Sequence, residues 1–183
     1  MKNLKVKVQL MDEDALHRAL MRLSYEIIEK KPNMDKLVLV GIETRGVPLA
    51  KEIQANILKI SNVSIPLERL NIQYYRDDLE KISEIPRVEK PSFTSDINGA
   101  EVVLVDDVLY TGRTARAAID ALFDIGRPAK VSLAILVDRG HRELPIRPDF
   151  VGKNVPTSNE EIISVNLEEI DGKTNVEICE VLE

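Results

Sequence analysis

The chain has 183 residues, of which 44 % are hydrophobic and 31 % charged, and a formal net charge of −6. This length and composition predict one globular domain over 1–183 and exclude wholesale disorder, collagen and coiled coil. A single cysteine excludes an intramolecular disulfide and a cysteine-rich metal site. No apolar run reaches the roughly 18–20 residues of a membrane helix, and lysines interrupt the apolar N-terminus. We therefore expect a soluble, cytoplasmic protein with no signal peptide and no membrane contact.

Charge is spread unevenly along the chain. Residues 160–183 carry eight acidic residues and one lysine, whereas residues 139–153 carry a local excess of positive charge. The overall negative charge argues against strong non-specific binding to nucleic acid. The basic stretch predicts either a local binding face or a mixed-charge solvated loop, and charge alone leaves both open.

Strands and helices are predicted to alternate in the first half of the chain. Apolar residues recur at helical spacing over 12–31, where Asp12 suits the helix start and Pro32 forbids continuation. The continuous apolar run 37–42 predicts a strand buried on both faces. A second helix is predicted from about Val47, and 63–72 are predicted to be extended.

The second half continues the alternation. Buried strands are predicted at 101–106 and 130–137, with a helix at 113–125 between them that Gly126 and Pro128 end. This order predicts an α/β fold with a central parallel sheet flanked by helices on both faces. Such folds bind ligands beyond the carboxyl ends of their strands.

Residues 73–99 break the pattern, because they are rich in charged residues and prolines and poor in apolar ones. The stretch is longer than a common connection. It predicts either a disordered insertion or a functional flap over the carboxyl edge of the sheet.

The segment 102–114, VVLVDDVLYTGRT, carries the most chemistry. Two adjacent carboxylates, Asp106 and Asp107, follow a strand and suit a sugar diol or a hard cation such as Mg²⁺. The turn 111–114 precedes a helix and can direct backbone N–H groups at an anion, with hydroxyl donors beside them. Together these features predict a site for a sugar that carries a 5′-phosphate. The alternative is a helix capped after a strand, with the acids serving as caps.

This segment resembles the phosphoribosyl pyrophosphate (PRPP) motif of type I phosphoribosyltransferases. The segments 41–46, 75–79 and 138–158 narrow the resemblance to the PyrR family of pyrimidine operon attenuators and uracil phosphoribosyltransferases. The resemblance covers about 10–180. It implies the type I phosphoribosyltransferase fold with a flexible flap, and transfer of phosphoribose from PRPP to uracil with release of UMP and pyrophosphate.

The resemblance implies a role for each matching residue. Asp106, Asp107 and Arg45 would be catalytic, with Mg²⁺ reaching the two carboxylates indirectly through PRPP. PRPP or UMP would contact Thr44, Arg45, Gly46, Arg76, Asp106, Asp107, Val108, Leu109, Tyr110, Thr111, Gly112, Arg113 and Thr114. A strained peptide is expected near 43–45, and Arg76 would begin the flap. Asp138, Arg139 and His141 would recognise the base, and contact with RNA or a surface loop are the alternatives for His141.

Members of this family bind the leader mRNA of the pyrimidine operon in a UMP-dependent way. The candidate RNA-binding residues in this chain are Arg22, Tyr25, Arg142, Arg147 and Lys153. A solvated or oligomer face is the alternative for the basic members of this set. The resemblance also implies a homodimer or homotetramer. Two other functions stay open, namely a salvage enzyme without RNA binding and a transferase for another base such as hypoxanthine or orotate.

Two residues are expected to be structural. His17 lies off the apolar face of the first helix and is predicted to be solvent-exposed, and Cys179 is predicted to be a core residue of a terminal strand. The acidic tail 160–183 is expected either to pack as a strand pair or to serve an interface.

Overall fold

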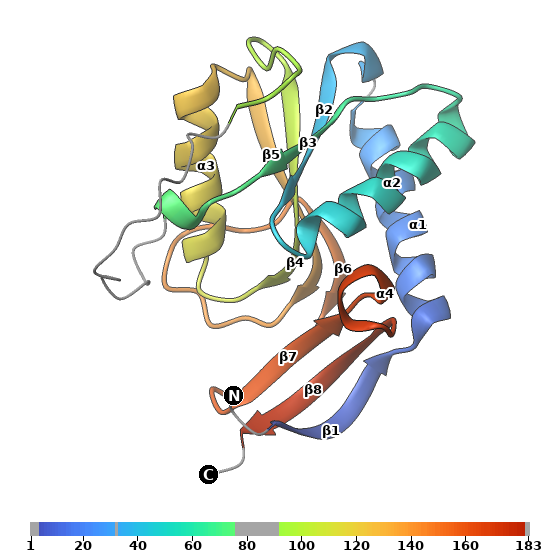
Figure 1. The fold of residues 1–183 in the computed structure, drawn as a ribbon, viewed down its shortest axis with the longest axis vertical. Helices are drawn as coiled ribbons and strands as arrows, with labels where there is room; N and C mark the ends of the chain where they lie inside the picture. The colour runs from blue at the N-terminus through green and yellow to red at the C-terminus, as the bar shows by residue number, and fades with distance from the viewer. Residues whose placement is uncertain (1–3, 32, 76–91, 182–183) are drawn as a thin grey trace.

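A computed structural model describes residues 4–31, 33–75 and 92–181. Its main element is a five-stranded parallel sheet in the order β3-β2-β4-β5-β6. The strands are β2 (Leu37–Ile42), β3 (Leu67–Leu70), β4 (Glu101–Leu109), β5 (Lys130–Asp138) and β6 (Phe150–Asn154). Helices α1 (Glu13–Lys30) and α2 (Gly46–Ser61) cover one face, and α3 (Arg113–Ile125) covers the other (Figure 1). The predicted α/β fold is confirmed.

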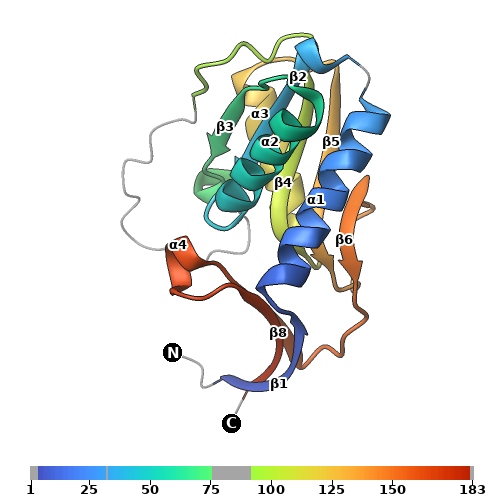
Figure 2. The ribbon, with the colours of Figure 1, turned by 90° about the vertical axis from the view of Figure 1, so that its right-hand side faces the viewer.

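A small antiparallel sheet, β1-β8-β7, lies beyond the carboxyl edge of the parallel sheet (Figures 1 and 2). It consists of β1 (Leu4–Met11), β7 (Glu161–Asn166) and β8 (Asn175–Val181), and the short helix α4 (Glu168–Asp171) joins its last two strands. Figure 1 shows α4 beside the start of α2. Of the two possibilities for the acidic tail, the strand pair is therefore present. Cys179 is 3 % exposed in β8, which confirms its predicted core position.

Helix α1 forms as its sequence predicts. The Asp12 side chain caps it by accepting a hydrogen bond from the backbone N–H of Ala15 at 2.8 Å. The apolar stripe at helical spacing, which includes Leu16, Leu23 and Ile27, is buried against α2 and the sheet. His17 lies off this stripe with 48 % of its side chain exposed, and its Nδ1 is 2.6 Å from Glu52 Oε1. It is exposed as predicted, and it also joins α1 to α2.

Several boundaries differ from the prediction. Strand β4 does not end at Asp106 but continues to Leu109, because β5 runs beside it as far as Asp138. The two carboxylates therefore lie within the strand and are fixed by its ladder. The extended segment 63–72 contains a strand only at Leu67–Leu70. Strands β1 and β6 were not predicted, since neither is a continuous apolar run.

Most of the predicted flap 73–99, including Arg76, lies outside the described residues. Its described ends are ordered on the core. Residues Gln73–Tyr75 form a 3₁₀ turn, and Thr94 and Ser95 donate hydrogen bonds to the buried Glu68 carboxylate on β3. Burial alone would raise the pKa of Glu68, but these hydrogen bonds outweigh it and hold the pKa below its usual range. Glu68 thus anchors the returning end of the segment as a carboxylate.

Candidate active site

Three loops meet at the carboxyl edge of the parallel sheet, one after each of β2, β4 and β5. This is the edge where open α/β sheets bind ligands. The loops bring together residues that are up to about 100 positions apart in sequence.

None of the helices in the described part of the chain is long and apolar enough to cross a membrane.

Asp106 and Asp107 occupy the end of β4. The backbone N–H of Asp107 donates to Asp106 Oδ1 at 2.9 Å, and that of Val108 donates to Asp107 Oδ1 at 2.8 Å. Burial raises the pKa of the Asp107 carboxyl, and the Val108 N–H, the Asp106 side chain and the charge of Arg45 oppose that rise. Asp106 is buried and Asp107 partly exposed, so this carboxylate pair is well suited to accept hydrogen bonds from the hydroxyl groups of a sugar.

The turn after β4 leads directly into α3. Gly112 adopts φ 96° as the residue before the helix, a backbone conformation that favours glycine. No side chain caps α3 in the described structure, and its first turn has no acidic residue. The segment after β5 braces the turn, because the N–H groups of Glu143 and Leu144 donate to Thr111 O. The turn 111–114 therefore leads into an uncapped helix N-terminus close in sequence to Asp106 and Asp107, and phosphate binding there stays a prediction.

The loop after β2 packs tightly on β4. Its Glu43–Thr44 peptide bond is cis, within the segment where the family resemblance implies an unusual peptide. Gly46 begins α2 so close to β4 that a Cβ atom there would lie 2.2 Å from Val105 O. Arg45 donates from Nε to Val165 O at 2.7 Å and from Nη2 to Asp171 Oδ1 at 2.8 Å. Close packing at Gly46 therefore places Arg45 near the carboxylate pair.

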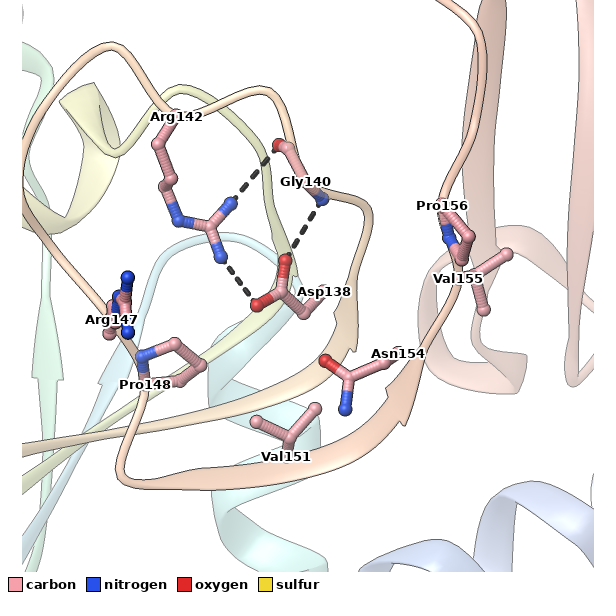
Figure 3. A pocket seen from close by; sticks show the side chains of 9 residues that line it. All are labelled: Asp138, Gly140, Arg142, Arg147, Pro148, Val151, Asn154, Val155 and Pro156. Carbon is pink, nitrogen blue, oxygen red and sulfur yellow. Dashed lines mark hydrogen bonds and ion pairs between the residues drawn. The ribbon is translucent and has the colours of Figure 1, made fainter.

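The loop after β5 is held by its own hydrogen bonds. Figure 3 shows Asp138 accepting from the Gly140 N–H and pairing with the Arg142 guanidinium. Arg142 also donates to Tyr110 O at 2.7 Å and to Ile146 O at 3.0 Å. Asp138, a candidate for base recognition, and Arg142, a candidate for RNA binding, thus bind each other and shape the loop.

The other base-recognition candidates form one cluster with Tyr110. The Arg139 guanidinium lies 4.1 Å from the centre of the Tyr110 ring and donates to Thr157 Oγ1 and Ser158 O. His141 Nε2 is 2.6 Å from Thr157 O. A carbonyl oxygen only accepts, so Nε2 carries the proton. Arg139 is 6 % exposed, whereas Tyr110 and His141 present exposed surface to a ligand.

The RNA-binding candidates lie on both sides of β6. Arg22 on α1 donates to the carbonyl oxygens of Val151 and Gly152, and Lys153 Nζ donates to Leu10 O at 3.3 Å. They line a hollow of about 340 Å³ together with Arg18, which the sequence analysis did not select. Arg142 and Arg147 line a neighbouring hollow of about 440 Å³ (Figure 3). Tyr25 is 56 % exposed on α1. Basic residues of α1 and of the segment 142–153 therefore line two hollows on the two sides of the missed strand β6, and we call these two hollows together the basic region around β6.

Few side chains in the described part of the chain are placed to bind a metal ion directly. The described residues contain no group of three or more His, Cys, Asp or Glu side chains that would hold a metal ion by themselves. The Asp106–Asp107 pair does offer the hard oxygen ligands that Mg²⁺ prefers. These residues fit a Mg²⁺ ion whose remaining ligands come from a bound substrate and water.

Comparison with known proteins agrees with this geometry. The family model described as "Phosphoribosyl transferase domain" matches residues 8–170. The hypoxanthine phosphoribosyltransferase of Trypanosoma cruzi has the same fold, with a TM-score of 0.73 and 16 % identity over 97 % of this chain and 98 % of that one. A Staphylococcus aureus hypoxanthine phosphoribosyltransferase gives a TM-score of 0.71 at 17 % identity, over 97 % of this chain and 93 % of that one. The protein is thus a phosphoribosyltransferase of the type I fold.

Sequence relatives give the family. "Bifunctional protein PyrR" of Clostridioides difficile is 58 % identical over 95 % of this chain and 98 % of that protein. "Bifunctional protein PyrR" of Clostridium perfringens is 55 % identical over 96 % of this chain and 98 % of that protein. The chain belongs to the PyrR family.

Proposed function

We propose that this protein transfers phosphoribose from PRPP to uracil, giving UMP and pyrophosphate, and that it also regulates the pyrimidine operon by binding leader mRNA. The observation that carries the enzymatic part is the Asp106–Asp107 pair, with Asp106 buried and Asp107 partly exposed, before the uncapped N-terminus of α3 and with the charge of Arg45 acting on Asp107. Sugar hydroxyls, a 5′-phosphate and a leaving pyrophosphate each have a chemically matched partner there.

The reaction breaks the bond from the sugar C1 to the pyrophosphate oxygen and forms a bond from C1 to uracil N1, whose proton passes to the departing pyrophosphate or to water. Positive charge develops on the sugar ring as pyrophosphate leaves. Asp106 and Asp107 would hold the ribose hydroxyls and stabilise that charge, and the N–H groups of 111–114 would hold the 5′-phosphate. Arg45, with the backbone of Thr44 and Gly46, would receive the pyrophosphate. Mg²⁺ bound to oxygens of PRPP, and reaching Asp106 and Asp107 only through that substrate, would neutralise pyrophosphate charge.

His141 and Tyr110 support uracil as the base. The bond from His141 Nε2 to Thr157 O makes Nδ1 the ring nitrogen that faces a ligand as an acceptor. Uracil carries a donating N3–H, and the Tyr110 ring offers a stacking surface beside it.

The first prediction concerns base choice. Purified protein given PRPP and Mg²⁺ is expected to form UMP from uracil at a rate at least about 100-fold above that with hypoxanthine, because the bicyclic ring of hypoxanthine presents a different hydrogen-bonding edge. Orotate carries the same N3–H edge as uracil and differs by a carboxylate at C6, so its rate tests the orotate alternative directly. Chromatography of the nucleotide products measures this. Faster conversion of another base would show that the protein is a transferase for that base.

The regulatory part rests on the basic region around β6. Five positive side chains line the two hollows there, and the exposed Tyr25 could stack on a base. We propose that this surface binds the hairpin of a pyrimidine leader mRNA in the cytoplasm.

A homodimer or homotetramer belongs to the same proposal, because Leu4, Val6 and Val8 stay exposed on β1 at the edge of the small sheet.

Arg147 provides the second prediction. Its exposed side chain makes no hydrogen bond or ion pair to any described residue, whereas Arg142 shapes its loop. Arg147→Gln is expected to weaken leader-hairpin binding about 3- to 10-fold and to lower the salt slope by about one, because one phosphate contact is lost. Filter binding with and without UMP measures this, and wild-type affinity is expected to rise with UMP. Lys59→Gln on exposed α2 removes the same charge elsewhere as the control. An effect no larger than that of Lys59→Gln, or no response to UMP, would contradict the RNA proposal.

A further inference from the structure

The Arg45 side chain, in the loop after β2, is held from the C-terminal part of the chain. It donates to Val165 O at 2.7 Å and to Asp171 Oδ1 at 2.8 Å. Val165 is on β7 and Asp171 ends α4, so both partners come from a part of the chain more than 100 residues away. Two of the three guanidinium nitrogens are used in this way. Nη1 makes no hydrogen bond to any described residue and stays available to a ligand.

Asp171 is itself fixed in place. Its Oδ2 accepts a hydrogen bond from the Leu167 N–H at 2.9 Å, and its own N–H donates to Leu167 O at 2.7 Å. The following residue, Gly172, ends α4 with φ 67°. One carboxylate oxygen therefore closes the start of α4 and the other one holds Arg45. Only 21 % of the Asp171 side chain is exposed, so water screens this pair incompletely.

The position of Arg45 is electrostatically unfavourable without Asp171. Arg45 precedes α2, where the helix dipole presents positive potential. Asp171 supplies the opposing charge at the same point. In this position the guanidinium still acts on the Asp107 carboxylate. Burial raises the pKa of Asp107, and the charge of Arg45 opposes that rise. Arg45 is thus already directed to the site where pyrophosphate would leave.

We propose that Asp171 is a positioning residue for the transferase reaction, fixing the Arg45 guanidinium so that its remaining donors meet the pyrophosphate group of PRPP. This inference rests on the proposed function of Arg45. It assigns a role in pyrophosphate binding to α4, a segment outside the three loops of the active site. The opposite arrangement is a latch, in which Asp171 competes with pyrophosphate for Arg45. The two arrangements predict opposite changes in PRPP affinity when Asp171 loses its charge.

The test uses Asp171→Asn in the full-length protein. Asparagine keeps an oxygen that can accept from the Leu167 N–H but removes the charge that pairs with Arg45. We expect the KM for PRPP and the inhibition constant of pyrophosphate to rise about 5- to 10-fold and the KM for uracil to stay unchanged, while loss of the ion pair lowers the melting temperature slightly. Asp171→Glu restores the charge and is expected to recover part of the affinity. A loss of stability alone would not raise the KM for PRPP while leaving the KM for uracil unchanged.

Lys51→Gln is the matched control. The Lys51–Glu169 ion pair at 3.0 Å also joins α2 to the α4 segment, but both of its side chains are mostly exposed and neither contacts Arg45. This variant is expected to keep wild-type kinetic constants. Unchanged PRPP and pyrophosphate affinity in Asp171→Asn, or a change equal to that of Lys51→Gln, would overturn the inference. Tighter PRPP binding in Asp171→Asn would also overturn it, by showing a latch.

Arg45→Ala separates this inference from the proposed function. If Arg45→Ala weakens PRPP binding and Asp171→Asn does not, Arg45 binds pyrophosphate without help from Asp171, and only the inference fails. If Arg45→Ala itself leaves PRPP and pyrophosphate affinity unchanged, the proposed role of Arg45 fails first. When both proposals hold, the double variant is expected to be no weaker than Arg45→Ala alone, because Asp171 acts through Arg45.

Discussion

Replacing Asp107 with asparagine is expected to slow UMP formation about 10²- to 10³-fold while leaving the protein at least as stable as the wild type. The loss in rate follows because a neutral amide gives little stabilisation to positive charge on the sugar ring, and such preorganised charge is a large part of catalysis. Stability is expected to be kept because Asn has nearly the same shape as Asp. Its carbonyl oxygen can still accept the hydrogen bond from the Val108 N–H.

The pH dependence of stability gives a second readout for the same variant. Burial raises the pKa of Asp107 in the folded protein, so the folded state disfavours the ionised carboxylate. The stabilising contribution of the protonated group is present at acid pH and is lost as the pH rises through the raised pKa. Asp107→Asn is therefore expected to equal or exceed the wild type in unfolding free energy at neutral pH, and the difference is expected to shrink on acidification. Urea unfolding at several pH values measures this.

Asp120→Asn is the control for Asp107→Asn. Asp120 is a half-exposed carboxylate on α3 that pairs with Arg116 on the same helix, so the substitution makes the same change in charge outside the site. It is expected to keep the wild-type rate. A wild-type rate in Asp107→Asn would show that the carboxylate pair is not the catalytic site.

Gly46→Ala is expected to destabilise the fold by about 2–4 kcal/mol and to lower activity more than about tenfold. The new Cβ would lie 2.2 Å from Val105 O and 3.3 Å from the Cα of Asp106, both of them backbone atoms of β4. Strand β4 is central in the sheet and cannot yield, so the start of α2 has to move away. Arg45 and Asp106 would then separate, and small displacements in a positioned site are costly.

The sign of the stability change distinguishes packing from helix propensity. Alanine is a better helix former than glycine by about 1 kcal/mol, so propensity alone predicts that Gly46→Ala stabilises α2. The control is Ala55→Gly on the exposed side of the same helix, which is expected to cost about 0.5–1 kcal/mol. Urea unfolding of both variants measures the effect. A stability gain in Gly46→Ala would contradict the packing observed at Gly46.

The local elements of this protein were predictable because their signals are local. Helix α1 follows from the Asp12 cap, the apolar stripe and Pro32, and β2 follows from one continuous apolar run. The motif at 102–114 indicated the carboxylate pair and the phosphate turn, since each feature depends on neighbours within a few residues. Strand β6 escaped prediction because Phe150–Asn154 is short and mixed in character, and only pairing with β5 makes it a strand.

The sequence by itself determined the fold class and the positions of the carboxylate pair and of the turn before α3, because hydrophobic period and motif spacing are properties of adjacent residues. Phosphate binding at that turn stays a prediction. The tertiary structure alone decided which residues lie on one surface and which of them form ion pairs. It placed Arg22 beside β6, made Asp138 the partner of Arg142, and brought Asp171 to Arg45. The contacts of Arg22 and of Asp171 join segments more than 100 residues apart, a separation that carries no periodic signal, and they form only when burial of the two sheets and their helices fixes the segments together. The Asp138–Arg142 pair spans only four residues, but it depends on the irregular loop after β5, which has no repeating pattern.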